Sequence, residues 1–167
     1  MTEVEQQVRT ALTACYEEVM WLAKRPNITP SMARGWYTHI VAESVKRKLR
    51  RFTGRVSRNA VTAEGEPLML EHFLRIQTTL TTLVKRHLSE LIDNPNEFVD
   101  LVIEFEQVHV VTRHENYSAM RAKGDYASAK IDLVPWFEIP TERQHVLWHR
   151  MLRGRVANAA DFRPSVI

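Results

Sequence analysis

Apolar residues recur at three- and four-residue steps near the start of the chain, which is the pattern of an amphipathic helix with one buried face. The stripe consists of Val4, Val8, Leu12, Cys15, Val19 and Leu22. It predicts a helix over residues 2–24. This helix should end before Pro26, because proline lacks the amide hydrogen that the next helical hydrogen bond requires.

A second apolar stripe follows a helix-start signal. Thr29 can cap a helix through its hydroxyl, and Pro30 suits the first helical position, where its missing amide hydrogen costs nothing. The stripe consists of Tyr37, Val41, Ala42, Val45, Leu49 and Phe52. It predicts a helix over residues 30–52, followed by a connection over 54–67 that is irregular or contains only a short helix.

The middle of the chain predicts two more helices. A mostly apolar face at helical spacing predicts a long helix over residues 68–92, which the sequence Asp93-Asn94-Pro95 interrupts. Pro95 then begins a shorter helix that ends near Glu106. The N-terminal part of the chain should therefore contain four helices.

Extended segments are predicted only after this point. Residues 108–111 are short and rich in valine, which favours a strand. Residues 131–139 are apolar but interrupted by Pro135, which suits an edge strand or an irregular packed segment, and pairing with 108–111 is expected.

Two helices flank the second extended segment. Thr112 and Glu115 have the spacing of a capping box, in which each side chain accepts a hydrogen bond from the other residue's backbone amide, and they predict a helix over 113–123. A final helix is predicted over residues 141–152.

These elements predict a mostly helical α+β protein, with four N-terminal helices, a small strand-containing module and a C-terminal helix. The 167 residues, 44% of them hydrophobic, suffice for a single domain over 1–167. The alternative is a two-lobed chain, with a helical lobe over 1–66 that carries the basic surface and an α+β lobe over 67–167. The lone Cys15 cannot form an internal disulfide, so we expect a cytoplasmic protein. No apolar run approaches the roughly 18 residues of a membrane-spanning helix, so no membrane partner is expected.

Charge is concentrated in one stretch. Every ionisable side chain between residues 46 and 58 is cationic: Lys46, Arg47, Lys48, Arg50, Arg51, Arg55 and Arg58. Without these seven, the 23 lysines and arginines fall to 16 against 20 carboxylates, so this stretch produces the net charge of +3. Seven cations without an acidic neighbour repel one another, and a polyanion relieves that repulsion. Phosphate backbones are the commonest such partner.

The leading hypothesis is therefore a small nucleic-acid-binding or nucleoprotein-interacting regulatory protein, without catalytic residues or a cofactor. It would contact phosphates through the stretch 46–58, with a second candidate patch at Arg150, Arg153 and Arg155. Another hypothesis is an interaction module or inhibitor whose basic face docks an acidic protein. A homo-oligomer is also compatible, because the acidic stretch over 90–106 can face the basic stretch of a second copy.

A metal-dependent nuclease is the enzymatic alternative. Its candidate catalytic residues are His72, His114, Glu115 and Asn116, which are the residue types that bind Mg²⁺ or Mn²⁺ or act as a general base. Residues 110–116 resemble the strand-and-helix segment of HNH nucleases, over a few residues and without paired glycines or a Cys-x-x-Cys frame. Glu115 already has a structural explanation in capping. His145 and His149 share a helical face but lack a third ligand, so no metal site is predicted.

Overall fold

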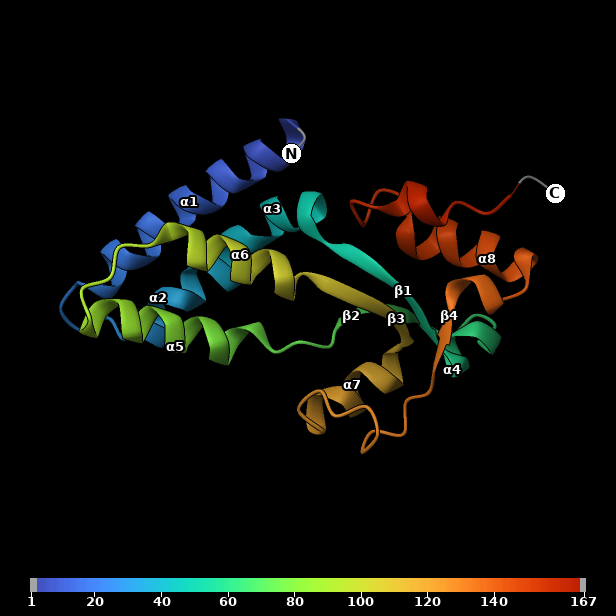
Figure 1. Ribbon diagram of the computed structural model, residues 1–167. Helices are drawn as coiled ribbons and strands as arrows, with labels where there is room; N and C mark the ends of the chain where they lie inside the picture. Colours follow the sequence, from blue (N-terminus) through green and yellow to red (C-terminus); the bar gives the residue numbers. More distant parts are fainter. Residues whose placement is uncertain (1–2, 166–167) are drawn as a thin grey trace. The chain divides into compact units, whose positions relative to one another are not determined.

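A computed structural model describes residues 3–165 and shows a mostly helical α+β protein, as the hydrophobic pattern predicts (Figure 1). The chain forms two compact units, each built from two separate stretches. The helical unit contains the residues up to 49 together with 75–105, and the sheet unit contains 50–74 together with the residues from 106 onward. The units therefore do not coincide with a division at residue 66.

The helical unit consists of α1 (Glu3–Ala23), α2 (Pro30–Trp36), a π-helical turn (Tyr37–Val41), α3 (Ala42–Leu49), α5 (Ile76–Ser89) and α6 (Pro95–Phe105). The predicted start of the first helix at Thr2 lies outside the described residues. The core contains Leu12, Tyr16, Leu80 and Phe98, all fully buried. The predicted stripe of α1 faces inward except at its start, where Val4 is exposed. Figure 1 shows α5 and α6 alongside α1 and α2 within this unit.

The helical run that begins at Pro30 ends earlier than its apolar stripe predicts. Thr29 caps it by accepting a hydrogen bond from the Met32 amide, as expected. Leu49 is the last helical residue, and the expectation of a helix through Phe52 is wrong. Phe52 lies instead on a strand, opposite Val108, because pairing with a distant segment outweighs the helical spacing of its side chain.

The sheet unit contains four strands: β1 (Arg51–Ser57), β2 (Leu68–His72), β3 (Gln107–Thr112) and β4 (Leu133–Pro135). Their order across the sheet is β2-β3-β1-β4, with β1 parallel to β3 and the other pairs antiparallel. Its helices are α4 (Arg58–Thr62), α7 (Arg113–Arg121) and α8 (Thr141–Leu147). Three shorter turns complete it: a 3-10 turn (Trp136–Glu138), a π-helical turn (Trp148–Leu152) and a 3-10 turn (Ala159–Phe162).

Two further expectations are corrected here. The predicted helix over 68–92 is divided into β2 and α5, because residues 68–72 pair along β3 with Glu71 opposite His109. The segment around Pro135 is a short strand as expected, but it pairs with β1, where Val134 lies opposite Val56. Pairing with β3 is impossible, since β1 and β2 occupy both of its edges.

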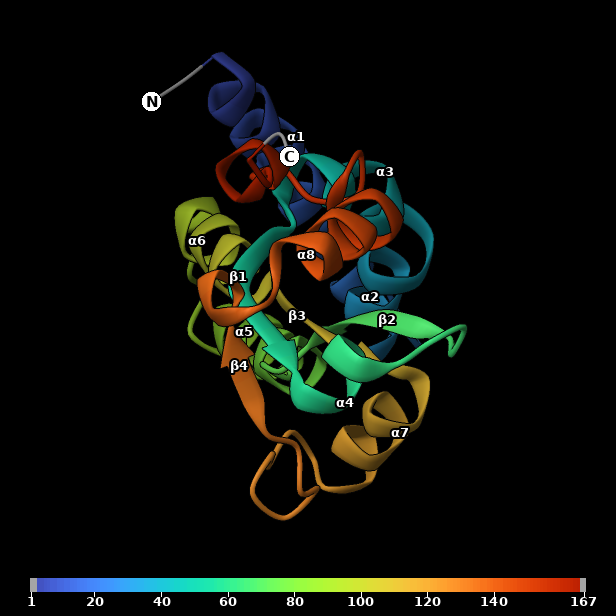
Figure 2. The same ribbon diagram turned by 90° about the vertical axis from the view of Figure 1, so that its right-hand side faces the viewer.

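The central strand β3 is buried on both faces. Val108 and Val110 belong to one core, with Leu147 and Leu152 from the C-terminal helical segment, while Val111 belongs to a smaller cluster with Ala119 of α7. Figures 1 and 2 accordingly show α8 and α7 on opposite sides of the sheet. Between residues 3 and 165, no helix combines the length and apolar character needed to span a bilayer.

Candidate nucleic-acid interface

The seven predicted cations are divided between the two units at the Leu49–Arg50 peptide bond. Lys46, Arg47 and Lys48 lie in the last turn of α3, where they stabilise the negative end of the helix dipole. Arg50 precedes β1, Arg51 and Arg55 lie on it, and Arg58 begins α4. The sequence pattern predicts that these cations lie on one helix and the loop after it. In the structure, the second part of that helix is a strand.

The Arg50 side chain is largely buried in the sheet unit, close to a buried carboxylate. Its Nε lies 3.9 Å from a carboxylate oxygen of Glu106, and the two side chains are 14% and 2% exposed. The same oxygen lies 2.9 Å from Nε2 of His72. A buried carboxylate is costly without compensating charge and hydrogen bonds, and Arg50 supplies positive charge close to Glu106.

Arg58 has a partner on the surface. Its Nε donates to Asp132 Oδ2 over 2.6 Å, and both side chains are about two-thirds exposed. Exposed ion pairs of this kind contribute roughly 0–1 kcal/mol, so a phosphate can exchange with the carboxylate at little cost.

Five cations of the stretch form no ion pair within residues 3–165: Lys46, Arg47, Lys48, Arg51 and Arg55. Lys46 is half-buried and the other four are exposed. These five side chains are the part of the predicted site that can reach an external anion.

Arg55 also affects the polar cluster on one face of the sheet. Burial, together with the charge of Arg55, lowers the pKa of His109 to about 4. His109 is therefore neutral at physiological pH and adds no positive charge to the surface.

The cluster around His109 spans three strands. Thr53 Oγ1 lies 2.6 Å from His109 Nδ1, and the imidazole ring stacks on Phe73 with 4.5 Å between centroids. On the neighbouring strand the buried Glu71 accepts a hydrogen bond from the hydroxyl of Tyr126. The alternation of residues 108–110 places His109 on the face opposite its valine neighbours, but no sequence signal identifies Phe73 and Tyr126 as its covering groups.

The candidate nuclease residues lie at different places in the sheet unit. The capping box is confirmed, and the buried Glu115 carboxylate also accepts hydrogen bonds from Ser57 Oγ at 2.5 Å and Asn59 Nδ2 at 2.9 Å. His114 is exposed and Asn116 half-buried, both in the first turn of α7.

His72 lies at the other end of β2 from the start of α7. Leu68 pairs with Thr112, the residue that caps α7, and His72 is four residues further along the strand, roughly 13 Å away. The structure thus does not bring His72 together with His114. Across residues 3–165, no three His, Cys, Asp or Glu side chains are grouped so as to hold a metal ion. His145 is instead within hydrogen-bonding distance of the Ser165 carbonyl, with 3.0 Å from Nε2.

The second candidate patch lies beside an aromatic ring. Arg150, Arg153 and Arg155 are exposed, and the Arg153 guanidinium lies 6.0 Å from the centre of the Trp148 ring. The guanidinium of Arg163, which the sequence pattern does not single out, lies 5.8 Å from the same ring. Both distances permit cation–π attraction.

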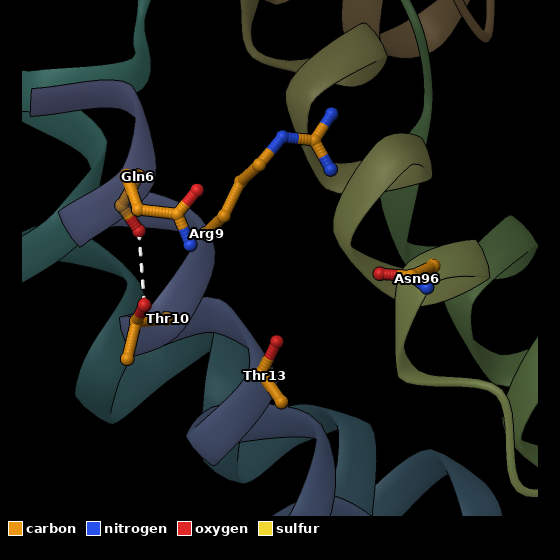
Figure 3. A pocket seen from close by; sticks show the side chains of 5 residues that line it. All are labelled: Gln6, Arg9, Thr10, Thr13 and Asn96. Carbon is orange, nitrogen blue, oxygen red and sulfur yellow. Dashed lines mark hydrogen bonds between the residues drawn. The ribbon is translucent and has the colours of Figure 1, made fainter. Parts of the chain in front are cut away.

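The helical unit has a polar groove of about 390 Å³ between α1 and α6 (Figure 3). It is lined by Gln6, Arg9, Thr10, Thr13 and Asn96. Arg9, its one charged lining residue, reaches across to Asp100 with 2.7 Å between Nη2 and Oδ1. The groove therefore combines an already paired cation with neutral polar groups, and its lining residues include no titratable general base.

Comparison with known proteins identifies no matching family model, no similar curated protein and no similar solved structure.

Proposed function

We propose that the protein binds nucleic acid through the cations of residues 46–58, as a nucleic-acid-binding or nucleoprotein-interacting regulatory protein. The observation that carries this proposal is the set of five cations that have no carboxylate partner among residues 3–165. In a nearly balanced chain, an unopposed group of this size favours binding of a polyanion, and contacts to the phosphate backbone release condensed counterions.

The distribution of charge between the units supports the proposal. The sheet unit has thirteen lysines and arginines against ten aspartates and glutamates, whereas the helical unit has ten of each. The net charge of +3 therefore resides in the sheet unit, which carries Arg51 and Arg55. Phosphate contacts from a strand and a helix end confer affinity without reading base sequence.

Reversal of charge at Arg47, Arg51 and Arg55 tests the proposal. The variant with all three changed to Glu should bind duplex DNA and RNA more weakly, whatever their sequence. The slope of its log affinity against log salt concentration should become less steep by about 0.9 for each duplex-DNA phosphate contact that is lost. Fluorescence anisotropy at two salt concentrations measures both effects.

A matched variant separates local contact from net charge. Lys24, Lys85 and Arg121 are exposed and lie outside the stretch, so changing these three to Glu alters the net charge by the same amount. We expect this control to retain most of the affinity and the salt slope. Equal weakening in both variants, with both folded by circular dichroism, would show that residues 46–58 are not the contact. Absence of nucleic-acid binding by the unaltered protein would favour an acidic protein partner.

A further inference from the structure

Phe137 is the most exposed aromatic side chain among residues 3–165, at 79%, although it follows the fully buried Trp136. Its ring stacks on Phe162, with 6.3 Å between centroids and 26° between planes. Phe162 in turn makes edge-to-face contacts with Phe52 at 4.8 Å and Trp136 at 6.2 Å. Phe137 is thus the outer ring of an aromatic column whose base lies in the core.

An irregularity in β1 allows the column to approach the strand. The register with β3 shifts between Phe52 and Val56, and Gly54 within the shift has a φ of +79°. A Cβ atom at Gly54 would lie 3.1 Å from a ring carbon of Phe162. The strand carrying Arg51 and Arg55 and the column ending at Phe137 are therefore in direct contact within one unit.

Two arginines lie near a second aromatic ring of the same unit, Trp148. Arg163 follows Phe162 in the chain, and its guanidinium and that of Arg153 both lie near the Trp148 ring. The indole orientation is set by a hydrogen bond from Nε1 to the Ala159 carbonyl at 2.8 Å. Between residues 136 and 163 there are five arginines and three carboxylates. We call Phe137, Phe162, Trp148, Arg153 and Arg163 the aromatic-arginine surface.

We propose that the aromatic-arginine surface binds unpaired nucleotides, with a base stacked on Phe137 and phosphates at Arg153 and Arg163. This inference rests on the proposed function and specifies the preferred form of nucleic acid. An exposed, supported ring offers a stacking face to any base, while guanidinium groups bind the backbone. In a duplex the base faces are already stacked on their neighbours, so only single strands or flipped nucleotides can use Phe137.

The cationic surroundings favour nucleic acid over a protein as the occupant of this surface. An exposed aromatic ring beside arginines can also dock on a protein. The excess of five arginines over three carboxylates between residues 136 and 163 favours an anionic occupant over a neutral apolar face. The protein alternative is an outcome of the experiment below.

The test compares Phe137→Ala with Tyr117→Ala, which removes another exposed aromatic side chain of the sheet unit. Fluorescence anisotropy is measured with a labelled 15-nucleotide oligo-dT and with a duplex of the same length. Phe137→Ala should weaken single-strand binding roughly tenfold and duplex binding less than twofold, because one base stack is lost. Tyr117→Ala should change neither affinity.

A second variant, Phe137→Leu, retains an apolar surface but removes the aromatic face. It should lose single-strand affinity nearly as much as Phe137→Ala. Unchanged single-strand affinity in folded Phe137→Ala would overturn the inference and leave the exposed ring for protein docking. Full retention in Phe137→Leu would also overturn it, because an apolar contact would then suffice without base stacking.

The two proposals fail in different ways. If the triple Glu variant at Arg47, Arg51 and Arg55 loses both affinities while Phe137→Ala changes neither, only the aromatic-arginine inference fails. If Phe137→Ala lowers single-strand affinity while the triple variant matches its control, the phosphate contact at residues 46–58 fails and the inference stands.

Discussion

Arg50 compensates the buried carboxylate of Glu106, with 3.9 Å between its Nε and Oε2 of the glutamate. A cation that sequence pattern alone assigns to a nucleic-acid surface is thus a structural residue. Cations that are neighbours in the stretch 46–58 therefore have different roles in the structure.

Replacement of Arg50 should therefore affect stability more than binding. We expect Arg50→Ala to lower the free energy of unfolding by about 1–3 kcal/mol, because the buried Glu106 loses a nearby positive charge and keeps only its contact with His72. The exposed neighbour provides the control, since Arg51→Ala should change stability by less than about 0.5 kcal/mol. Urea denaturation of both variants measures the difference, and equal stability losses would contradict the assigned role of Arg50.

The stability of the fold should depend on the protonation of His109. The pKa of its imidazole is lowered from 6.5 to about 4 by burial and by Arg55. Between these pH values the unfolded chain binds a proton that the folded chain does not, so stability is greatest above pH 6.5 and falls as the pH approaches 4. The loss over this window should be on the order of 3 kcal/mol.

His109→Phe isolates this contribution, because phenylalanine can keep the stack on Phe73 without a titrating group. Unfolding free energies at pH 4.5, 5.5 and 6.5 should fall less steeply for the variant than for the unaltered protein. Identical slopes would show that His109 is not the source of the acid sensitivity.

Gly54 should tolerate a side chain less well than Gly154. Both residues have positive φ, at +79° and +69°, so alanine costs about 1 kcal/mol of backbone strain at either position. At Gly54 the added methyl group also meets the Phe162 ring at 3.1 Å, whereas nothing lies within 4 Å at Gly154. Thermal unfolding should show a larger loss for Gly54→Ala, and equal losses would mean that the aromatic column shifts without cost.

We expect no nuclease activity from this chain. The carboxylate of Glu115 accepts hydrogen bonds from three groups of its own unit, and His72 lies at the far end of β2 from His114. Plasmid, single-stranded DNA and RNA should all stay intact during incubation with Mg²⁺ or Mn²⁺. Cleavage that depends on metal and is lost in His114→Ala would contradict this expectation.

Helices with strong apolar periodicity and local start signals were predictable from the sequence. Thr29 and Pro30 begin a helical run, Pro95 begins α6, and Thr112 with Glu115 forms the capping box before α7. Each of these signals acts within about four residues, so it operates wherever the segment lies in the fold. The α+β class follows from the same local patterns.

The nature of the first two strands was not predictable in this way. Phe52 continues a helical stripe and residues 68–72 begin another, yet both segments pair along β3, more than thirty residues away in sequence. A short apolar segment fits either a helix or a strand, and the available pairing partner determines which forms.

For the candidate site, the sequence by itself determined the concentration of positive charge between residues 46 and 58, because composition does not depend on folding. Only the tertiary structure decided that Arg50 compensates Glu106 and Arg58 pairs with Asp132. It alone decided that Phe137 stands exposed on Phe162. The physical reason is that burial and ion pairing depend on contacts between residues far apart in the chain, and no local pattern specifies those contacts.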